Sequence, residues 1–271
     1  MTSTHSSRPF LRIPAALGAL GGLLLACNLL VPGAATPAPA GAGTPQVIKA
    51  AGDISAAMEQ YRALLGANNG GDPGAKPNGR REINWDGVPD EIAAPNNYPS
   101  DFFNAPDAPR ARGIVLNTPG TALVVSADSD NPTGTLPRFG NINPTYVDIF
   151  TPFSPERMFS PVGSNIVDLT FFVPGTQTPA LVRGFGAVYV DVDTEHTAFE
   201  YFDAAGNSLG SYGVPIADGG VSFLGVAFDQ PIVSRVKVEY GTVALGPDDS
   251  PESDVAVMDD FIFGEPQAAK P

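Results

Sequence analysis

Three pairs of aspartates stand where strands end or turns begin, and carboxylate oxygens are the ligands that hard cations such as Ca²⁺ take in proteins. Asp191 and Asp193 project from one face of an expected strand, about 6 to 7 Å apart for a rise of about 3.3 Å per residue. The other two pairs are Asp128 with Asp130 and Asp259 with Asp260. The pattern makes Ca²⁺ the leading cofactor hypothesis, and structural turns and caps at these positions are the alternative.

Asp259 and Asp260 are adjacent within an expected strand, so strict alternation places one carboxylate toward each face of the sheet. At least one of them then points inward or toward an edge. Since a buried carboxylate needs a cation or hydrogen bonds from the protein, this one either coordinates a metal or caps the backbone amides of a neighbouring loop.

The chain lacks the residues that most catalytic mechanisms require. His196 is the only histidine outside the first 31 residues, no Gly-x-Ser-x-Gly motif occurs, and Cys27 is the only cysteine. A nucleophile–histidine triad and a zinc site therefore have no support, and His196 is expected in a solvated loop. A hydrolase that uses paired carboxylates stays open, because the sequence does not reveal how far apart acidic residues lie in space.

An aromatic face on which a pyranose ring can stack is one common basis of sugar binding, and Trp85 is the only tryptophan. Its neighbours Asn84 and Asp86 could supply polar contacts, and Tyr98 lies in the same coil-like stretch. The alternative is that Trp85 fills the core beneath a covering segment.

The lone Cys27 ends the run Leu24-Leu25-Ala26-Cys27, which follows a basic start and an apolar stretch. These are the three parts of an export signal. The run resembles the bacterial lipobox, in which cleavage leaves a lipidated cysteine as the N-terminus. Cleavage near Ala35 or Ala40, or an uncleaved anchor, are the alternatives, and each of the three exports the rest of the chain to the cell envelope or beyond.

The charge balance limits the partners. The chain has 29 acidic and 15 basic residues, a formal net charge of −14. Such a charge repels nucleic acid and anionic lipid headgroups, so we expect no nucleic-acid partner and membrane contact only through the leader or its lipid. No thiol remains for an intradomain disulfide, so the stability of the exported part must come from a hydrophobic core.

After residue 112 the sequence consists of short apolar runs between turn residues, a pattern typical of antiparallel strands. The nine expected strands are 113–116, 123–126, 146–150, 166–173, 182–192, 198–202, 221–228, 232–240 and 255–263. Because no helical segments separate them, we expect an all-β fold, an antiparallel jelly-roll-like β-sandwich. Ahead of it, the spacing of Ile54, Met58, Tyr61 and Leu65 predicts one short helix over 53–65.

These patterns divide the chain into five parts. A leader spans 1–31, and a Pro-, Ala- and Gly-rich linker spans 32–45. The short helix and an ordered covering coil occupy 46–112, the β-sandwich occupies 113–265, and 266–271 form a disordered tail.

Three segments, 79–87 (GRREINWDG), 150–157 (FTPFSPER) and 257–264 (VMDDFIFG), resemble those of uncharacterised exported bacterial proteins. The likeness implies the fold and the location, and no activity comes with it. More loosely, a last strand with Asp-Asp-Phe is similar to jelly-roll carbohydrate-binding modules and lectin-like sandwiches, some of which hold a structural calcium.

Taken together, the sequence predicts an exported surface module without catalytic activity. The expected partner is an extracellular glycan or another component of the cell envelope. An extracellular hydrolase that uses acidic residues and a purely structural envelope protein are the alternative functions.

Overall fold

The computed structural model describes residues 43–250 and 253–269. Cys27, the leader, nearly all of the predicted linker and the last two residues of the predicted tail lie outside these ranges, so their predictions stay as they are. No helix among the described residues is long and apolar enough to cross a membrane.

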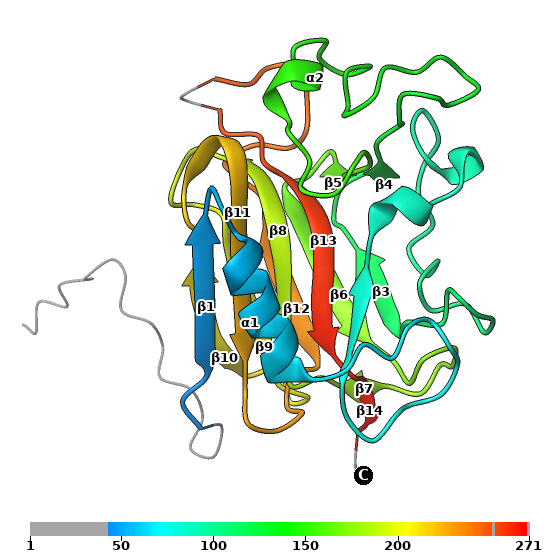
Figure 1. Cartoon of the computed structure of the whole chain (residues 1–271), viewed down its shortest axis with the longest axis vertical. Helices are drawn as coiled ribbons and strands as arrows, with labels where there is room; N and C mark the ends of the chain where they lie inside the picture. The colour runs from blue at the N-terminus through cyan, green and yellow to red at the C-terminus, as the bar shows by residue number, and fades with distance from the viewer. Residues whose placement is uncertain (1–42, 251–252, 270–271) are drawn as a thin grey trace, which may run out of the picture. The chain divides into compact units, whose positions relative to one another are not determined.

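The described part of the chain is a sandwich of two antiparallel sheets (Figure 1). The first sheet contains β1 (Gln46–Ala51), β2 (Arg80–Ile83), β4 (Ala122–Val125), β5 (Phe159–Val162), β8 (Gly184–Val192), β11 (Ala217–Ala227) and β13 (Val257–Gly264). The second contains β3 (Ile114–Asn117), β6 (Ile166–Phe171), β9 (Ala198–Phe202), β10 (Ser208–Gly213) and β12 (Arg235–Glu239). The short strands β7 (Ala180–Leu181) and β14 (Gln267–Ala268) pair with each other. The predicted all-β sandwich is confirmed.

The strand order is that of a jelly roll. The first sheet contains the run β5-β13-β8-β11, and the second contains the run β6-β12-β9-β10. Between β5 and β13 the chain therefore alternates between the sheets, and β9–β10 is the one hairpin within a sheet. This topology brings β8, β11 and β13 side by side in the first sheet, although they are far apart in the sequence.

The core lies between the two sheets and follows the alternation of the strands. In β12, Val236 and Val238 are fully buried, whereas Arg235, Lys237 and Glu239 are only partly covered. Aromatic rings of β8 and β9 pack against each other across the core, where the ring centroids of Phe185 and Phe199 are 5.2 Å apart. The alternation of buried and partly exposed residues in β12 is that of a strand with one face in the core.

The predicted helix is α1 (Ser55–Leu65), which covers the outer face of the first sheet (Figure 1). Its buried residues are Met58, Tyr61 and Leu65, as the spacing predicts. The Tyr61 ring lies directly over Gly225 of β11, where a Cβ would be 2.7 Å from the ring, and its hydroxyl donates to the Val226 carbonyl at 2.9 Å. A strand without side chains at this point lets the helix approach closely.

One predicted strand is wrong. Residues 146–150 form the short helix α2 (Tyr146–Ile149), in which the rings of Tyr146 and Phe150 stack with centroids 4.3 Å apart. Their spacing of four residues fits one helical turn as well as it fits alternation. Conversely, β1, β2, β5, β7 and β14 were not expected as strands. β1 and β2 extend the first sheet from within the predicted covering segment, and β14 pairs with β7 although residues 266–271 were expected to form a disordered tail.

A buried ion pair holds the rest of the covering segment in place. Arg81 and Glu265 are almost completely buried, and Arg81 Nη2 lies 2.8 Å from Glu265 Oε1. The same guanidinium donates to the carbonyl groups of Gly70, Asp72, Gly74 and Ala111. A charged group at this place satisfies backbone acceptors of a loop that has few ladder hydrogen bonds of its own.

Candidate cation site

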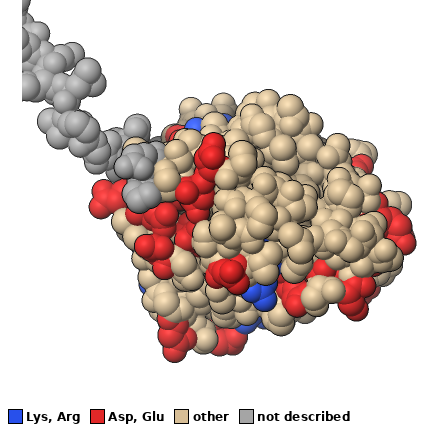
Figure 2. Space-filling model, turned by 90° about the horizontal axis from the view of Figure 1, so that it is seen from above, with Lys and Arg blue, Asp and Glu red and all other residues tan. Residues whose placement is uncertain are grey.

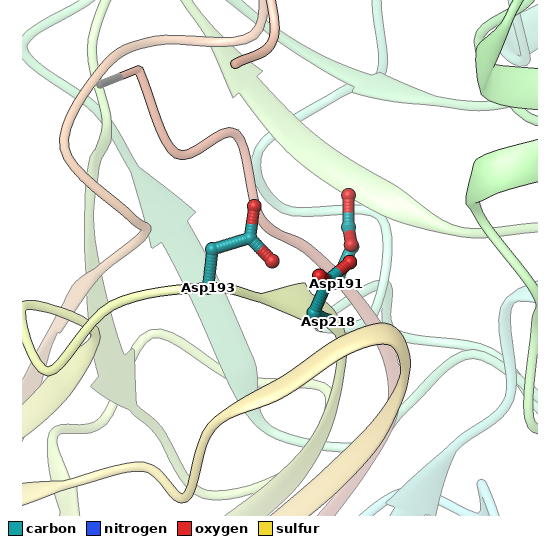
Figure 3. A group of neighbouring side chains, drawn as sticks. All are labelled: Asp191, Asp193 and Asp218. Atoms are coloured by element: carbon teal, nitrogen blue, oxygen red, sulfur yellow. The ribbon is translucent and has the colours of Figure 1, made fainter. Parts of the chain in front are cut away.

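Three carboxylates converge at the end of the sandwich that carries α2. Asp191 and Asp193 come from the end of β8 and the residue after it, and Asp218 comes from the start of the neighbouring strand β11. Each of the three can offer an oxygen that lies within 4.8 Å of an oxygen of the others. Figure 3 shows their side chains directed toward a common space. Of the three predicted pairs, the Asp191–Asp193 pair is thus completed by a third carboxylate.

The local backbone brings these residues together. Asp191 has a positive φ of 64°, an uncommon conformation for a residue with a side chain, although Asp tolerates it better than most. Asp191 Oδ1 accepts a hydrogen bond from the Gly219 amide at 2.7 Å. The pairing of β11 with β8 is irregular between Ala217 and Val221. The extra residues at this irregularity allow Asp218 to lie beside the end of β8.

The three carboxylates line a pocket of about 290 Å³. The rest of its lining is Asp148, Ile149, Gly219, Asp249 and Ser250. No lysine or arginine is among these lining residues, and none of the five aspartates forms an ion pair within the described ranges. Acidic side chains outnumber basic ones over this end of the molecule (Figure 2). The pocket is therefore an accumulation of negative charge without a compensating protein cation.

The carboxyl pKa values reflect this charge. Burial raises the pKa of Asp191 to about 7, a hydrogen bond from the Gly219 amide opposes the rise, and the charges of the neighbouring aspartates add to it. Burial and nearby aspartates likewise raise the pKa of Asp193 to about 6 and raise the pKa of Asp249. Each carboxylate that is ionised in this pocket therefore makes the ionisation of its neighbours less favourable.

Two oxygens at the pocket have no hydrogen-bond partner. The Oδ1 atoms of Asp193 and Asp249 are shielded from solvent, and no donor among the described residues reaches them. Shielded carboxylate oxygens without donors are costly unless a cation or a water satisfies them. Oxygen-only donors, several carboxylates and uncompensated charge fit a hard divalent cation.

The pair Asp128 and Asp130 lies in a second acidic pocket of about 340 Å³, together with Asp86 and Glu156. This pocket contains its own cation. Arg157, which is 3 % exposed, forms ion pairs with Asp90 and with Asp128. The guanidinium supplies a positive charge beside Asp128, as the structural alternative requires, although Asp128 Oδ1 has no hydrogen-bond partner among the described residues. Asp130 is exposed and forms no ion pair within the described ranges.

Asp259 and Asp260 are both buried, and Ser154 Oγ lies 2.9 Å and 3.1 Å from their Oδ1 atoms. Both carboxyls therefore lie on one side of β13, which corrects the expectation of one carboxylate on each face. The pairing of β13 with β8 shifts between Met258 and Phe261, and this bulge breaks the alternation. Asp259 Oδ2 accepts the backbone amides of Phe153 and Ser154. This pair therefore caps a loop, the second of its two expected roles.

Trp85 does not form an open stacking platform. Its side chain is fully buried and stacks on Phe159 at 4.5 Å, and Phe261 contacts it edge-on at 5.0 Å. The indole N–H donates to the Asp259 carbonyl at 2.8 Å. Tyr98 packs beside Trp85 and is 4 % exposed. Trp85 therefore fills the core, which was the alternative to sugar binding. Neither face of its ring is open to a sugar.

The polar neighbours of Trp85 serve local structure. Asn84 Oδ1 accepts the Asp86 amide, and Asp86 Oδ1 accepts the Arg157 amide. The solvated position predicted for His196 is confirmed, since it lies exposed in the loop between β8 and β9.

The sequence did not single out Asp148, Asp218 or Asp249. Asp218 precedes Gly219 and Gly220, a turn signal that indicates an aspartate near the point where a strand begins. Only the pairing of β11 with β8 tells which other aspartates it meets.

No protein-family model, no curated protein and no solved structure matches this chain in comparisons of sequence and structure.

Proposed function

We propose that this chain is an exported β-sandwich module without catalytic activity that binds Ca²⁺ between Asp191, Asp193 and Asp218. The observation that carries the proposal is the convergence of their oxygens within 4.8 Å in a pocket whose lining includes no basic side chain. An ion there would offset the repulsion among the carboxylates and would join β8, β11 and the loop of Asp249.

Thermal unfolding tests this proposal. Calcium should raise the melting temperature of the chelator-treated protein, and excess chelator should lower it again. Asp193→Asn should lose most of this shift. Glu195→Gln is the matched control, because Glu195 is exposed two residues further along and does not line the pocket. No shift with calcium in the wild-type protein would reject the site.

An extracellular glycan is the ligand class that we propose for the same pocket. Three carboxylates do not fill the coordination of Ca²⁺, so further oxygens must come from water, from Asp148 or Asp249, or from a ligand. The pocket has no aromatic wall and is negatively charged, which favours neutral hydroxyl groups over an anionic sugar. Binding on a glycan array that requires calcium and disappears in Asp193→Asn would support this ligand class, and calcium binding without any glycan binding would exclude it.

A hydrolase that uses acidic residues is the second candidate function. It is favoured by two neighbouring carboxyls whose pKa values burial raises, to about 7 for Asp191 and to about 6 for Asp193, because such carboxyls can exchange protons near neutral pH. Turnover of an oligosaccharide that Asp191→Asn and Asp193→Asn each abolish would favour the enzyme over the binding module.

The location is also a proposal. The leader and Cys27 predict export with a lipid anchor or secretion after cleavage. Mass spectrometry of the mature N-terminus distinguishes a lipidated Cys27 from cleavage near Ala35 or Ala40.

A further inference from the structure

The buried pair Asp259 and Asp260 shares one serine hydroxyl. Ser154 Oγ lies 2.9 Å from Asp259 Oδ1 and 3.1 Å from Asp260 Oδ1. The same oxygen accepts a hydrogen bond from Asn84 Nδ2 at 3.1 Å. Ser154 belongs to the segment 150–158 that leads from α2 to β5, so these contacts fix that segment to the bulge in β13.

The number of hydrogens in this cluster requires one more proton. A serine hydroxyl has a single hydrogen and can donate to only one of the two carboxyls. The other short contact is a hydrogen bond only if that carboxyl is protonated and donates to Oγ. Both assignments place one proton on the pair; two ionised carboxylates would have to share the single hydroxyl hydrogen, a weaker arrangement that leaves their repulsion unopposed.

The hydrogen-bond donors around the pair indicate which carboxyl holds the proton. Asp259 can receive the amides of Phe153 and Ser154 as well as the serine hydroxyl. Asp260 accepts no backbone amide within the described residues, and its side-chain contacts are with Ser154 and with the carboxyl of Asp259. Because donors stabilise the ionised form, the hydrogen-bond geometry assigns the charge to Asp259 and the proton to Asp260, although burial raises the pKa of Asp259, to about 8, further than that of Asp260, to about 6.

Charged groups on the neighbouring elements do not replace this proton. Arg62 of α1 faces Asp260 and lowers its pKa, and Glu82 of β2 raises it. Arg62 is already paired with Glu82 and with Glu59, and Arg80 also pairs with Glu82. Burial raises the pKa of both aspartates, and the charge of Asp260 adds to the rise at Asp259.

We propose that Asp259, Asp260 and Ser154 form a proton-dependent latch, which holds the segment 150–158 on β13 while the pair carries one proton and releases it when that proton leaves. This segment directly follows Asp148 and Ile149, which line the candidate cation pocket, and it includes Arg157 of the second acidic pocket. Loss of the proton therefore loosens the segment that connects the two pockets. The latch depends on neither pocket binding a ligand.

Amide hydrogen exchange of Phe153, measured from pH 5 to pH 9 and corrected for the intrinsic exchange rate, tests the latch. Protection of Phe153 should fall by about tenfold for each pH unit above the pKa of the pair. The amide of Leu169 in the second sheet reports global unfolding and serves as the internal reference. Protection of Phe153 that stays constant relative to Leu169 over this range overturns the proposal.

Two variants separate the roles of the carboxyls. Asp260→Asn retains a donor toward Ser154 Oγ and should keep the Phe153 amide protected at every pH. Asp259→Asn loses the charge that the two backbone amides stabilise and should weaken protection at every pH. The reverse pattern overturns the assignment of the proton. The carboxyl ¹³C shifts of the wild-type protein give a check without mutation: at pH 6 they should show one protonated member of the pair, and two ionised carboxylates overturn the latch.

Discussion

Asp191→Asn should stabilise the protein in the absence of calcium. Asn tolerates the positive φ of residue 191 and keeps an oxygen for the Gly219 amide, so the substitution removes the charge and little else. Burial, together with the charges of the neighbouring aspartates, raises the pKa of Asp191 to about 7 from an ordinary value of 3.8. This difference corresponds to about 4 kcal/mol at high pH. Because the carboxylate faces an open pocket and solvent screens it, we expect about 2 kcal/mol to be measured.

The sign of this effect depends on pH. A carboxyl whose pKa is higher in the folded state binds more protons there, so its contribution to stability declines as pH rises from about 4 to about 7. At pH 8 the free energy of unfolding of Asp191→Asn should therefore be about 2 kcal/mol larger than that of the wild-type protein, which corresponds to a melting temperature about 4 to 8 °C higher. The two proteins should converge as pH falls toward 4.

Urea unfolding in the presence of a chelator measures this difference, with Glu195→Gln as the control that should stay within about 0.5 kcal/mol of the wild-type protein. The reasoning is refuted if Asp191→Asn is no more stable than the wild-type protein at pH 8. It is also refuted if any gain is the same at pH 5 and pH 8, because a charge effect must follow the titration of the carboxyl.

Three further predictions concern the frame around the site. Glu265→Gln leaves the buried guanidinium of Arg81 without its counter-charge and should lower the free energy of unfolding in urea by about 3 to 5 kcal/mol. A loss below 1 kcal/mol would contradict the structural role of the Arg81–Glu265 ion pair. Trp85→Ala should cost about 3 to 5 kcal/mol, because it empties a fully buried site; iodide that readily quenches the Trp85 fluorescence of the wild-type protein would contradict this burial. Gly225→Ala places a methyl group against the Tyr61 ring and should lower the melting temperature by several degrees; an unchanged melting temperature would show that α1 shifts freely.

The sequence predicts those parts of the fold that depend on local patterns. The alternation in β12 identifies its buried face, and Asp203 with Gly206 marks the β9–β10 turn, where Asp203 Oδ1 accepts the amides of Ala205 and Asn207. Strands with weaker patterns are missed. β5 contains Pro161, which counts against a strand, and β1 has mostly exposed residues because it lies at the edge of its sheet.

The site is predictable only in part, for physical reasons. The spacing of Asp191 and Asp193 places them on one strand, but Asp218 joins them through the jelly-roll order, which brings β11 beside β8. The bulge at Asp259 and Asp260 likewise depends on pairing with β8, and alternation alone gives the wrong face for one of them. The sequence also does not show that Arg157 forms an ion pair with Asp128, whereas no basic side chain among the described residues lines the pocket of Asp191.

The most direct test of the cation site is a calorimetric titration of Ca²⁺ into the chelator-treated protein, repeated with Asp193→Asn and Glu195→Gln. We predict saturable binding by the wild-type protein, an affinity reduced by about tenfold or more in Asp193→Asn, and unchanged binding in Glu195→Gln. Calcium binding that Asp193→Asn leaves unchanged, or no saturable binding by the wild-type protein, would contradict the site.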